Sequence, residues 1–154
     1  MSSVTVVDHS VEVIGFTNES IKLALTATGF SVAGHAKELS PVDTGFLRNS
    51  ITFGLGGEVP KIAEYSDDKG EQHGRYEDSC PADDEGKATV YVGTNVEYAP
   101  YVELGHKQEP GRYVPAIGKR LKKPFVAGKA YLRPAFENNM EEIRQIFEKY
   151  LKDI

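Results

Sequence analysis

The sequence predicts an α+β fold in which a small antiparallel sheet packs against an N-terminal helix and a long C-terminal helix, with long loops between them. Apolar residues recur at spacings of three and four over residues 18–39 and from residue 134 onward, which is typical of amphipathic helices. Short apolar stretches at 4–16, 46–54 and 88–92 indicate strands. A length of 154 residues suits one domain, so we expect residues 1–154 to fold together.

The N-terminal half supplies a strand, a helix and a second strand. In residues 4–16, Val11 and Val13 alternate with polar neighbours, which is the pattern of a half-buried strand. A helix follows from Asn18, a good N-cap residue, to a stop at Ser40 because the next residue is Pro41. Its apolar stripe comprises Ile21, Leu25, Val32, Ala36 and Leu39. After a turn at 41–45, we expect residues 46–54 to form a strand with Leu47, Ile51 and Phe53 on one side.

Residues 64–86 break this pattern because they carry nine acidic residues against only Lys69 and Arg75. Such a composition predicts a solvated loop or a partly ordered acidic insertion.

The C-terminal half begins with a strand at 88–92, followed by Gly93, Thr94 and Asn95, which are residue types that favour a turn. Pro100 suits the first turn of a short helix that Gly105 ends. Residues 106–130 hold three glycines and three prolines and predict a long loop or a hairpin arm. From residue 134 we expect one continuous helix of about 19 residues, which is about 28 Å long at the usual rise. Its stripe comprises Phe136, Met140, Ile143, Phe147, Tyr150 and Ile154.

The formal net charge of −5 hides two opposed segments. Against the acidic insertion stands the stretch 106–133, in which Glu109 is the one acid among eight cations: Lys107, Arg112, Lys119, Arg120, Lys122, Lys123, Lys129 and Arg133. Tyr113, Phe125 and Tyr131 lie among these cations, which fits contact with nucleic acid and fits docking on an acidic protein surface equally well. The two segments could also meet between subunits, since a head-to-tail ring needs two different complementary surfaces.

Several functional classes find little support in the residues. Residues 1–16 lack the features of a signal peptide, no stretch has the length of a membrane span, and Cys80 is the single cysteine, so we expect no membrane association and a reducing cytoplasm. His9, His35, His73 and His106 show no metal-ligand spacing, and Gly54–Gly57 lacks the residues of a phosphate-binding loop. We therefore expect no metal, no cofactor and no catalytic residue.

The segment Asp43-Thr44-Gly45 is similar to the active-site loop of aspartic proteases, which would require a dimer in a chain of this length. Here a predicted helix and Pro41 precede it and Phe46 follows it. We expect instead a turn in which Asp43 and Thr44 accept backbone N–H bonds and Gly45 adopts a conformation closed to other residues.

Three segments together resemble the HK97 gp10-like family of phage tail-completion, or head–tail joining, proteins. They are Pro41–Ile51 (PVDTGFLRNSI), Val92–Gly105 (VGTNVEYAPYVELG) and Tyr131–Phe136 (YLRPAF), in matching order and spacing. The resemblance implies a non-enzymatic virion component of long-tailed phages that is present in the host cytoplasm before assembly. It also implies a homo-oligomeric ring, commonly of six subunits, that meets the head connector or adaptor on one side and the tail terminator or tail tube on the other.

The residues that carry the resemblance become candidate functional positions. The motif and turn positions are Pro41, Asp43, Thr44, Gly45, Arg48, Gly93 and Thr94. Candidate interface positions are Tyr98, Tyr101, Glu103, Arg112, Lys119, Arg120, Lys122, Lys123 and Arg133. We expect Arg48 and Arg133 to pair with Asp43, Glu97 or Glu103, and Tyr98 and Tyr101 to serve either contact or core packing.

Two alternatives to a structural protein stay open at this point. One is a nucleic-acid-binding module that uses the basic segment 107–133, and with it a contact to packaged DNA. The other is a hydrolase that uses Asp43 or His106.

Overall fold

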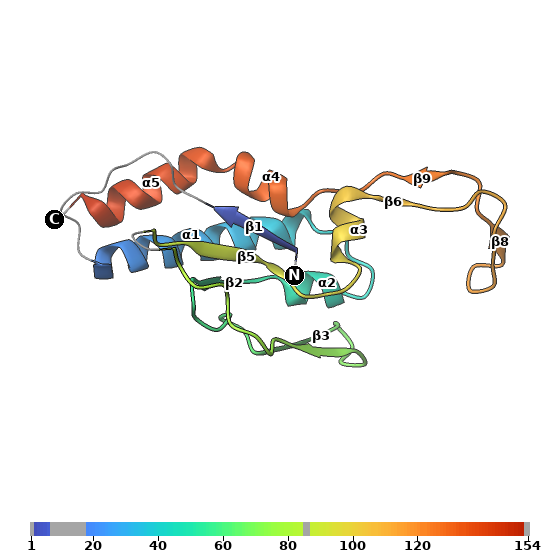
Figure 1. Ribbon diagram of the computed structural model, residues 1–154, viewed down its shortest axis with the longest axis horizontal. Coiled ribbons are helices and arrows are strands. Elements are labelled where there is room, and N and C mark those ends of the chain that lie inside the picture. The colour runs from blue at the N-terminus through green and yellow to red at the C-terminus, as the bar shows by residue number, and fades with distance from the viewer. Residues whose placement is uncertain (1, 7–17, 85–86, 153–154) are drawn as a thin grey trace.

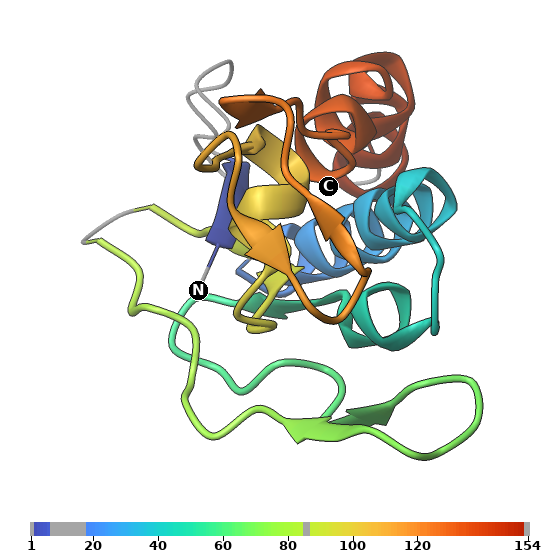
Figure 2. The same ribbon diagram turned by 90° about the vertical axis from the view of Figure 1, so that its right-hand side faces the viewer.

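A computed structural model describes residues 2–6, 18–84 and 87–152 of the chain, and it has the predicted α+β architecture (Figure 1). The central sheet is antiparallel with the strand order β1 (Ser2–Val6), β5 (Val90–Thr94), β2 (Thr52–Leu55). The long helix α1 (Asn18–Leu39) packs on β2 and β5, and the C-terminal helices α4 (Leu132–Glu137) and α5 (Met140–Leu151) lie along α1. Figure 2 shows α1, α4 and α5 together on one side of the sheet.

The core lies between α1, the sheet and α4. Leu25, Val32 and Ala36 of the predicted stripe are buried in it, whereas Leu39 at the end of α1 is about half exposed. Their partners are Ile51, Phe53, Val90, Val92, Tyr131, Leu132, Ala135 and Ile143. Gly29 leaves room on α1 for the ring of Phe53, because a Cβ at this position would overlap that ring. The sheet and α1 can therefore approach closely.

A polar cluster joins α1 to α5. The Glu142 carboxylate accepts a hydrogen bond from Ser31 Oγ at 2.6 Å and lies 2.8 Å from His35 Nε2. The hydrogen bond from Ser31, and then that from His35, hold the pKa of Glu142 below its usual value. This cluster fixes α5 along the N-terminal helix.

The second predicted strand is wrong over its first half, because Phe46–Ser50 forms the short helix α2 and only Thr52–Leu55 forms a strand. Gly45 has a φ of 83°, and the Asn49 N–H donates to its carbonyl at 2.9 Å, which closes a helical turn. Leu47 and Ser50 are buried together at the helical spacing of three. The strand predicted at 4–16 is described only as β1, since Val11 and Val13 lie outside the described residues.

The turn predicted at residues 93–95 begins later than expected. Gly93 and Thr94 belong to β5, where Gly93 pairs with Ser3 and Thr52 and Thr94 pairs with Ser2. Pairing with the two neighbouring strands keeps Gly93 and Thr94 in the sheet, so the chain turns only after Thr94. The Thr94 Oγ1 accepts the Val96 N–H at 3.1 Å in this turn. The short helix that follows, α3 (Ala99–Leu104), ends at Gly105 as predicted, with a φ of 84° at that glycine.

The C-terminal helix is two helices and not the single helix that was predicted. The interruption falls at Asn138 and Asn139, and Asn139 Nδ2 donates to the Ala135 carbonyl at 2.8 Å. Asparagine side chains compete with the backbone for hydrogen bonds, which favours helix ends over helix interiors. Met140, predicted to face inward, is therefore about half exposed, and Ile154 lies outside the described residues.

Candidate functional site

Two β-hairpins leave the body and carry the two charged segments (Figures 1 and 2). The first, here called the acidic hairpin, spans residues 64–78 and contains β3 (Glu64–Ser66) and β4 (His73–Arg75). Of the two alternatives predicted for residues 64–86, this hairpin fits the partly ordered insertion and not the solvated loop. The second, the basic arm, spans residues 105–130. It confirms the hairpin alternative for 106–130 through two strand pairs: β6 (His106–Lys107) with β9 (Phe125–Val126), and β7 (Tyr113–Val114) with β8 (Lys119–Arg120).

Helix α2 holds the tip of the acidic hairpin. Arg48 Nη2 donates to Asp68 Oδ1 at 2.7 Å, and Asn49 Nδ2 donates to the same oxygen at 3.0 Å and to the Ser66 carbonyl at 2.9 Å. The hydrogen bond from Asn49, and then the charge of Arg48, keep the pKa of Asp68 below its usual value. Arg48 therefore pairs with an acid of the insertion and not with Asp43, Glu97 or Glu103.

The end of β5 holds the base of the acidic hairpin. Tyr65 Oη donates to Asn95 Oδ1 at 2.5 Å, and Asn95 Nδ2 donates to the Arg75 carbonyl at 2.8 Å. Tyr76 donates its hydroxyl to the Ser50 carbonyl, and burial raises the pKa of Tyr76 to about 12. The aromatic rings of Tyr65 and Tyr76 are the sequence signal that distinguishes this hairpin from a solvated loop, because a solvated loop offers no surface on which such rings can pack.

The Pro41–Gly45 turn acts as a connector between α1 and α2. Thr44 Oγ1 accepts the Phe46 N–H at 3.3 Å as predicted, and the Thr44 carbonyl accepts the Asp68 N–H at 2.9 Å. Gly45 lies under the Asp68 carboxylate, where a Cβ would overlap it. Asp43 is exposed, and within the described residues its carboxylate accepts none of the predicted backbone bonds. A helix precedes this aspartate, unlike the strand that precedes the protease loop.

Thr94 and Ser50 join the two motif segments inside the body. Both are fully buried, and their hydroxyl oxygens are 2.6 Å apart. This hydrogen bond links α2 to β5, so the two anchors of the acidic hairpin are held to each other.

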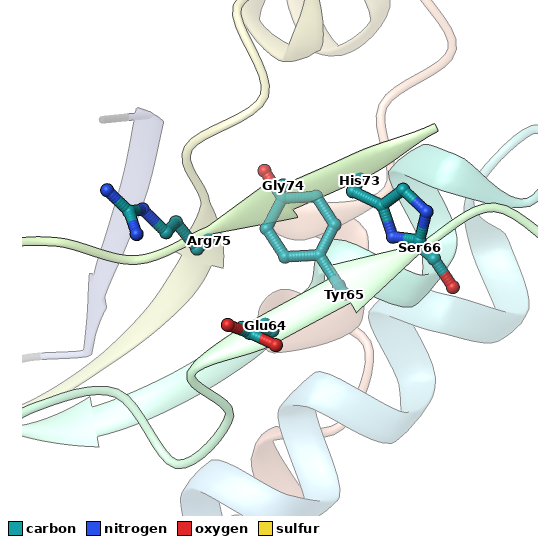
Figure 3. A pocket seen from close by; sticks show the side chains of 6 residues that line it. All are labelled: Glu64, Tyr65, Ser66, His73, Gly74 and Arg75. Atoms are coloured by element: carbon teal, nitrogen blue, oxygen red, sulfur yellow. The ribbon is translucent and has the colours of Figure 1, made fainter. Parts of the chain in front are cut away.

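The acidic hairpin has a shallow concavity on its surface (Figure 3). It is lined by Glu64, Tyr65, Ser66, His73, Gly74 and Arg75. The Tyr65 ring lies against Gly74, where any Cβ would overlap it, and Arg75 Nη2 pairs with Glu77 Oε1 at 2.8 Å. Glu64 precedes Tyr65 in β3, so its carboxylate points to the opposite face of the hairpin from the Tyr65 ring, and it has no ion-pair partner among the described residues.

Glu103 fixes the root of the basic arm. Its Oε2 accepts the N–H groups of Tyr131 and Leu132 at 2.7 and 3.0 Å, and its Oε1 accepts the N–H of Arg133 at 3.0 Å. These donors are the first N–H groups of α4, which have no partner inside the helix. A side chain that precedes the arm thus binds the residues that follow it.

Two glycines complete the root, because the strands cross there in close contact. A Cβ on Gly105 would lie 2.8 Å from the backbone nitrogen of Gly128. A Cβ on Gly128 would lie 2.7 Å from the backbone carbonyl oxygen of Glu103. The Lys129 N–H donates to the Val102 carbonyl at 2.7 Å beside this crossing. Gly128, Asn49 and Asn95 were not predicted from the sequence, in which their only signal is a position in or beside the motif segments.

The basic arm presents its cations to solvent. Arg112, Lys119, Arg120, Lys122 and Lys123 are exposed, and none has an acidic partner among the residues that the structure describes. Arg120 alone is held, through a hydrogen bond to the Gly111 carbonyl at 2.8 Å and by its place over the Tyr113 ring.

The remaining candidate interface residues lie near the root of the arm. Tyr98 and Tyr101 are exposed on α3, so neither is a core residue. The Arg133 side chain is also exposed and pairs with Glu137 at 2.9 Å, whereas Glu103 binds only the Arg133 backbone. Arg133 is therefore paired locally along α4 and not with any of the acids predicted for it.

The described residues offer no cluster of metal ligands, since no three His, Cys, Asp or Glu side chains among them gather in a way that could hold a metal ion. Cys80 is a buried free thiol, and burial raises its pKa. Among the described helices, none combines the length and apolar character needed to cross a membrane.

A comparison with protein families gives a match to the HK97 gp10-like family of bacteriophage tail components over residues 12–105. No curated protein and no solved structure matches the chain. The matched range includes α1, the Pro41–Gly45 turn, the acidic hairpin, β5 and α3, and it covers well over half of the chain. The chain therefore belongs to the HK97 gp10-like family of phage tail components.

Proposed function

We propose that this chain is a non-enzymatic structural protein of the phage head–tail interface, which completes the tail by assembling as a ring with six subunits as the expected number. Residues 1–154 act as one domain in this ring. Its partners are copies of itself, the head connector or adaptor, and the tail terminator or tail tube. The protein reaches the neck of the virion from the host cytoplasm.

The observation that carries this proposal is that the segments that resemble the family hold the acidic hairpin and the basic arm in place. Arg48 and Thr44 hold the acidic hairpin, Thr94 links its two anchors, and Glu103 holds the root of the basic arm. None of these residues gathers in an enclosed cleft suited to a small substrate, whereas each orients a large exposed surface. Residues that orient surfaces suit an assembly protein.

The exposed residues around the arm root support the same role. Tyr98, the N-cap of α3, and Tyr101 and Leu104 within α3 present apolar area beside the root of the basic arm. Aromatic residues supply much of the contact energy in protein interfaces. We propose that this surface and the arm residues Arg112, Lys119, Arg120, Lys122 and Lys123, together with Arg133, contact other virion proteins, and that Pro41, Asp43, Gly45 and Gly93 shape the turns and strands behind them.

Deletion of the gene from the phage or prophage that encodes the chain tests the proposal. We expect filled heads and separate tails in electron micrographs, and joined particles again when the gene is supplied in trans. Native mass spectrometry of isolated necks should find the chain in several copies. Normal joining in the deletion strain would refute the proposal.

The unpaired cations of the basic arm, with exposed Tyr113 and Phe125 among them, favour one second candidate, a nucleic-acid-binding module. In a virion neck, that activity would be a contact with packaged DNA. Retention on DNA that weakens with salt, and that disappears when Lys119, Arg120, Lys122 and Lys123 are reversed to Glu, would support it.

A further inference from the structure

We propose that the basic arm of one copy docks on the acidic hairpin of a neighbouring copy. The inference rests on the proposed ring, since it names the two surfaces through which adjacent subunits join. It adds a specific contact that the ring alone does not require.

The basic arm is exposed along its whole length, so docking on a partner would bury apolar surface of the arm. None of the residues 105–130 is buried, and the arm strands pair with one another instead of packing on the body. An isolated two-stranded hairpin is only marginally stable in water. Tyr113, Ile117 and Phe125 are each about half exposed along it, so docking on a protein surface would bury apolar area that the arm cannot bury alone.

The charges of the two projections are complementary and unpaired. On the arm, Lys119, Lys122 and Lys123 have no acidic partner among the described residues. On the acidic hairpin, Asp68 and Glu77 form ion pairs within the chain. Three other acids are exposed and have no ion-pair partner among the described residues: Glu64, Glu71 and Asp78. Opposite potentials of this kind steer association and set the register of an interface.

The concavity on the acidic hairpin suits a lysine or arginine of the arm. Glu64 lines it, is exposed and has no ion-pair partner among the described residues, so its carboxylate is available to such a cation (Figure 3).

A second copy is the occupant that these observations favour. Within one chain, no hydrogen bond or ion pair joins the described residues of the hairpin and the arm, and the two projections leave the body separately (Figure 1). Two complementary surfaces that do not meet inside one subunit suit a head-to-tail contact between copies, which forms a ring when the rotation from copy to copy closes.

Reciprocal charge reversal in the intact virion tests the contact. The arm variant carries Lys119→Glu, Lys122→Glu and Lys123→Glu, and the hairpin variant carries Glu64→Lys, Glu71→Lys and Asp78→Lys. A control variant reverses three exposed cations far from both projections, two in α5 and one at its C-cap: Arg144→Glu, Lys149→Glu and Lys152→Glu. Each gene is expressed in the deletion strain and joined particles are counted. Circular dichroism checks folding, and the neutral Gln and Asn versions replace any variant that does not fold.

We expect the arm variant and the hairpin variant each to lower the yield of joined particles by at least about a hundredfold, because like charges then face one another across the contact. Expressing the two variants together should restore joining, since each supplies the charge that the other lacks. The control should join heads normally.

Each contrary result has a separate meaning. Normal joining with either variant overturns the arm–hairpin contact but leaves the ring in place. Loss with both variants that co-expression does not restore also overturns it, and assigns the arm to DNA or to another virion protein. Normal joining in the deletion strain itself refutes the proposed function.

Discussion

Removal of the Glu103 carboxylate should destabilise the root of the basic arm, although Glu103 lies on a short surface helix. The carboxylate accepts three backbone N–H groups at the start of α4, at 2.7, 3.0 and 3.0 Å. Loss of a capping side chain costs about 0.5–2 kcal/mol, and a negative charge at a helix N-terminus contributes about 0.3–1 kcal/mol more. Water can reach part of this site, so we expect Glu103→Ala to lower the free energy of unfolding by about 1–3 kcal/mol.

That loss corresponds to a melting temperature lower by about 2–12 °C for a chain of this size. Glu103→Gln keeps an oxygen that can accept a bond but lacks the charge, so it should lose roughly half as much free energy. Urea denaturation measures both values. Amide hydrogen exchange locates the effect, because the amides of Tyr131, Leu132 and Arg133 should lose protection before those of α1.

A matched control is available at Glu97, which is exposed and has no ion-pair partner among the described residues. Glu97→Ala should change stability by no more than about 0.5 kcal/mol. If Glu103→Ala matched this control and exchange at the three amides were unchanged, the carboxylate would not be what holds the root of the arm.

Three further predictions concern the core, the arm root and the α1–α5 contact. Tyr131 is fully buried and its hydroxyl has no hydrogen-bond partner among the described residues, so Tyr131→Phe should leave the melting temperature equal or higher; a clear fall would mean that the hydroxyl is bonded. Gly128→Ala places a Cβ against the backbone of Gly105 and should cost about 1–3 kcal/mol in urea denaturation, whereas Gly34→Ala, in open space on α1, should stabilise by about 0.5–1 kcal/mol. Because the pKa of Glu142 is lowered in the folded protein, its contribution is present above the unfolded pKa and is lost as pH falls through the folded pKa, so Glu142→Gln should reduce the loss of stability below about pH 4; equal acid sensitivity in both proteins would contradict this.

The sequence was informative where one pattern had one interpretation. The stripe of α1 predicted its length and inner face, because 22 residues of helical spacing leave no strand alternative. At Leu47, Ile51 and Phe53, spacings of four and two both occur, and the change of period marks the passage from α2 to β2. Spacing alone cannot locate such a change within a few residues. Between α4 and α5 the apolar residues keep their helical spacing across the helix end. The two asparagines, Asn138 and Asn139, were therefore the only sequence signal of the interruption.

The ion pairs were the least predictable part of the site. Arg48 was expected to find an acid within the motif segments, yet its partner Asp68 lies 20 positions away in a segment whose composition indicated solvent. Charge counts describe a segment as a whole and do not reveal which of its acids form ion pairs within the chain. Asp68 does so because the Asp68 N–H donates to the Thr44 carbonyl, which brings the carboxylate over Gly45, where the missing side chain leaves room for it.

The matched range of the family ends at residue 105, which is also the first residue of the arm root. The acidic hairpin and the turns that hold it lie inside the match, whereas the arm cations lie beyond it. Glu103, just inside the match, binds the backbone that re-enters the body at Tyr131, and it does so through main-chain N–H groups that almost any arm sequence would supply. The body can therefore hold arms of different composition in the same direction, and the charge of the arm can follow the charge of the surface on which it docks.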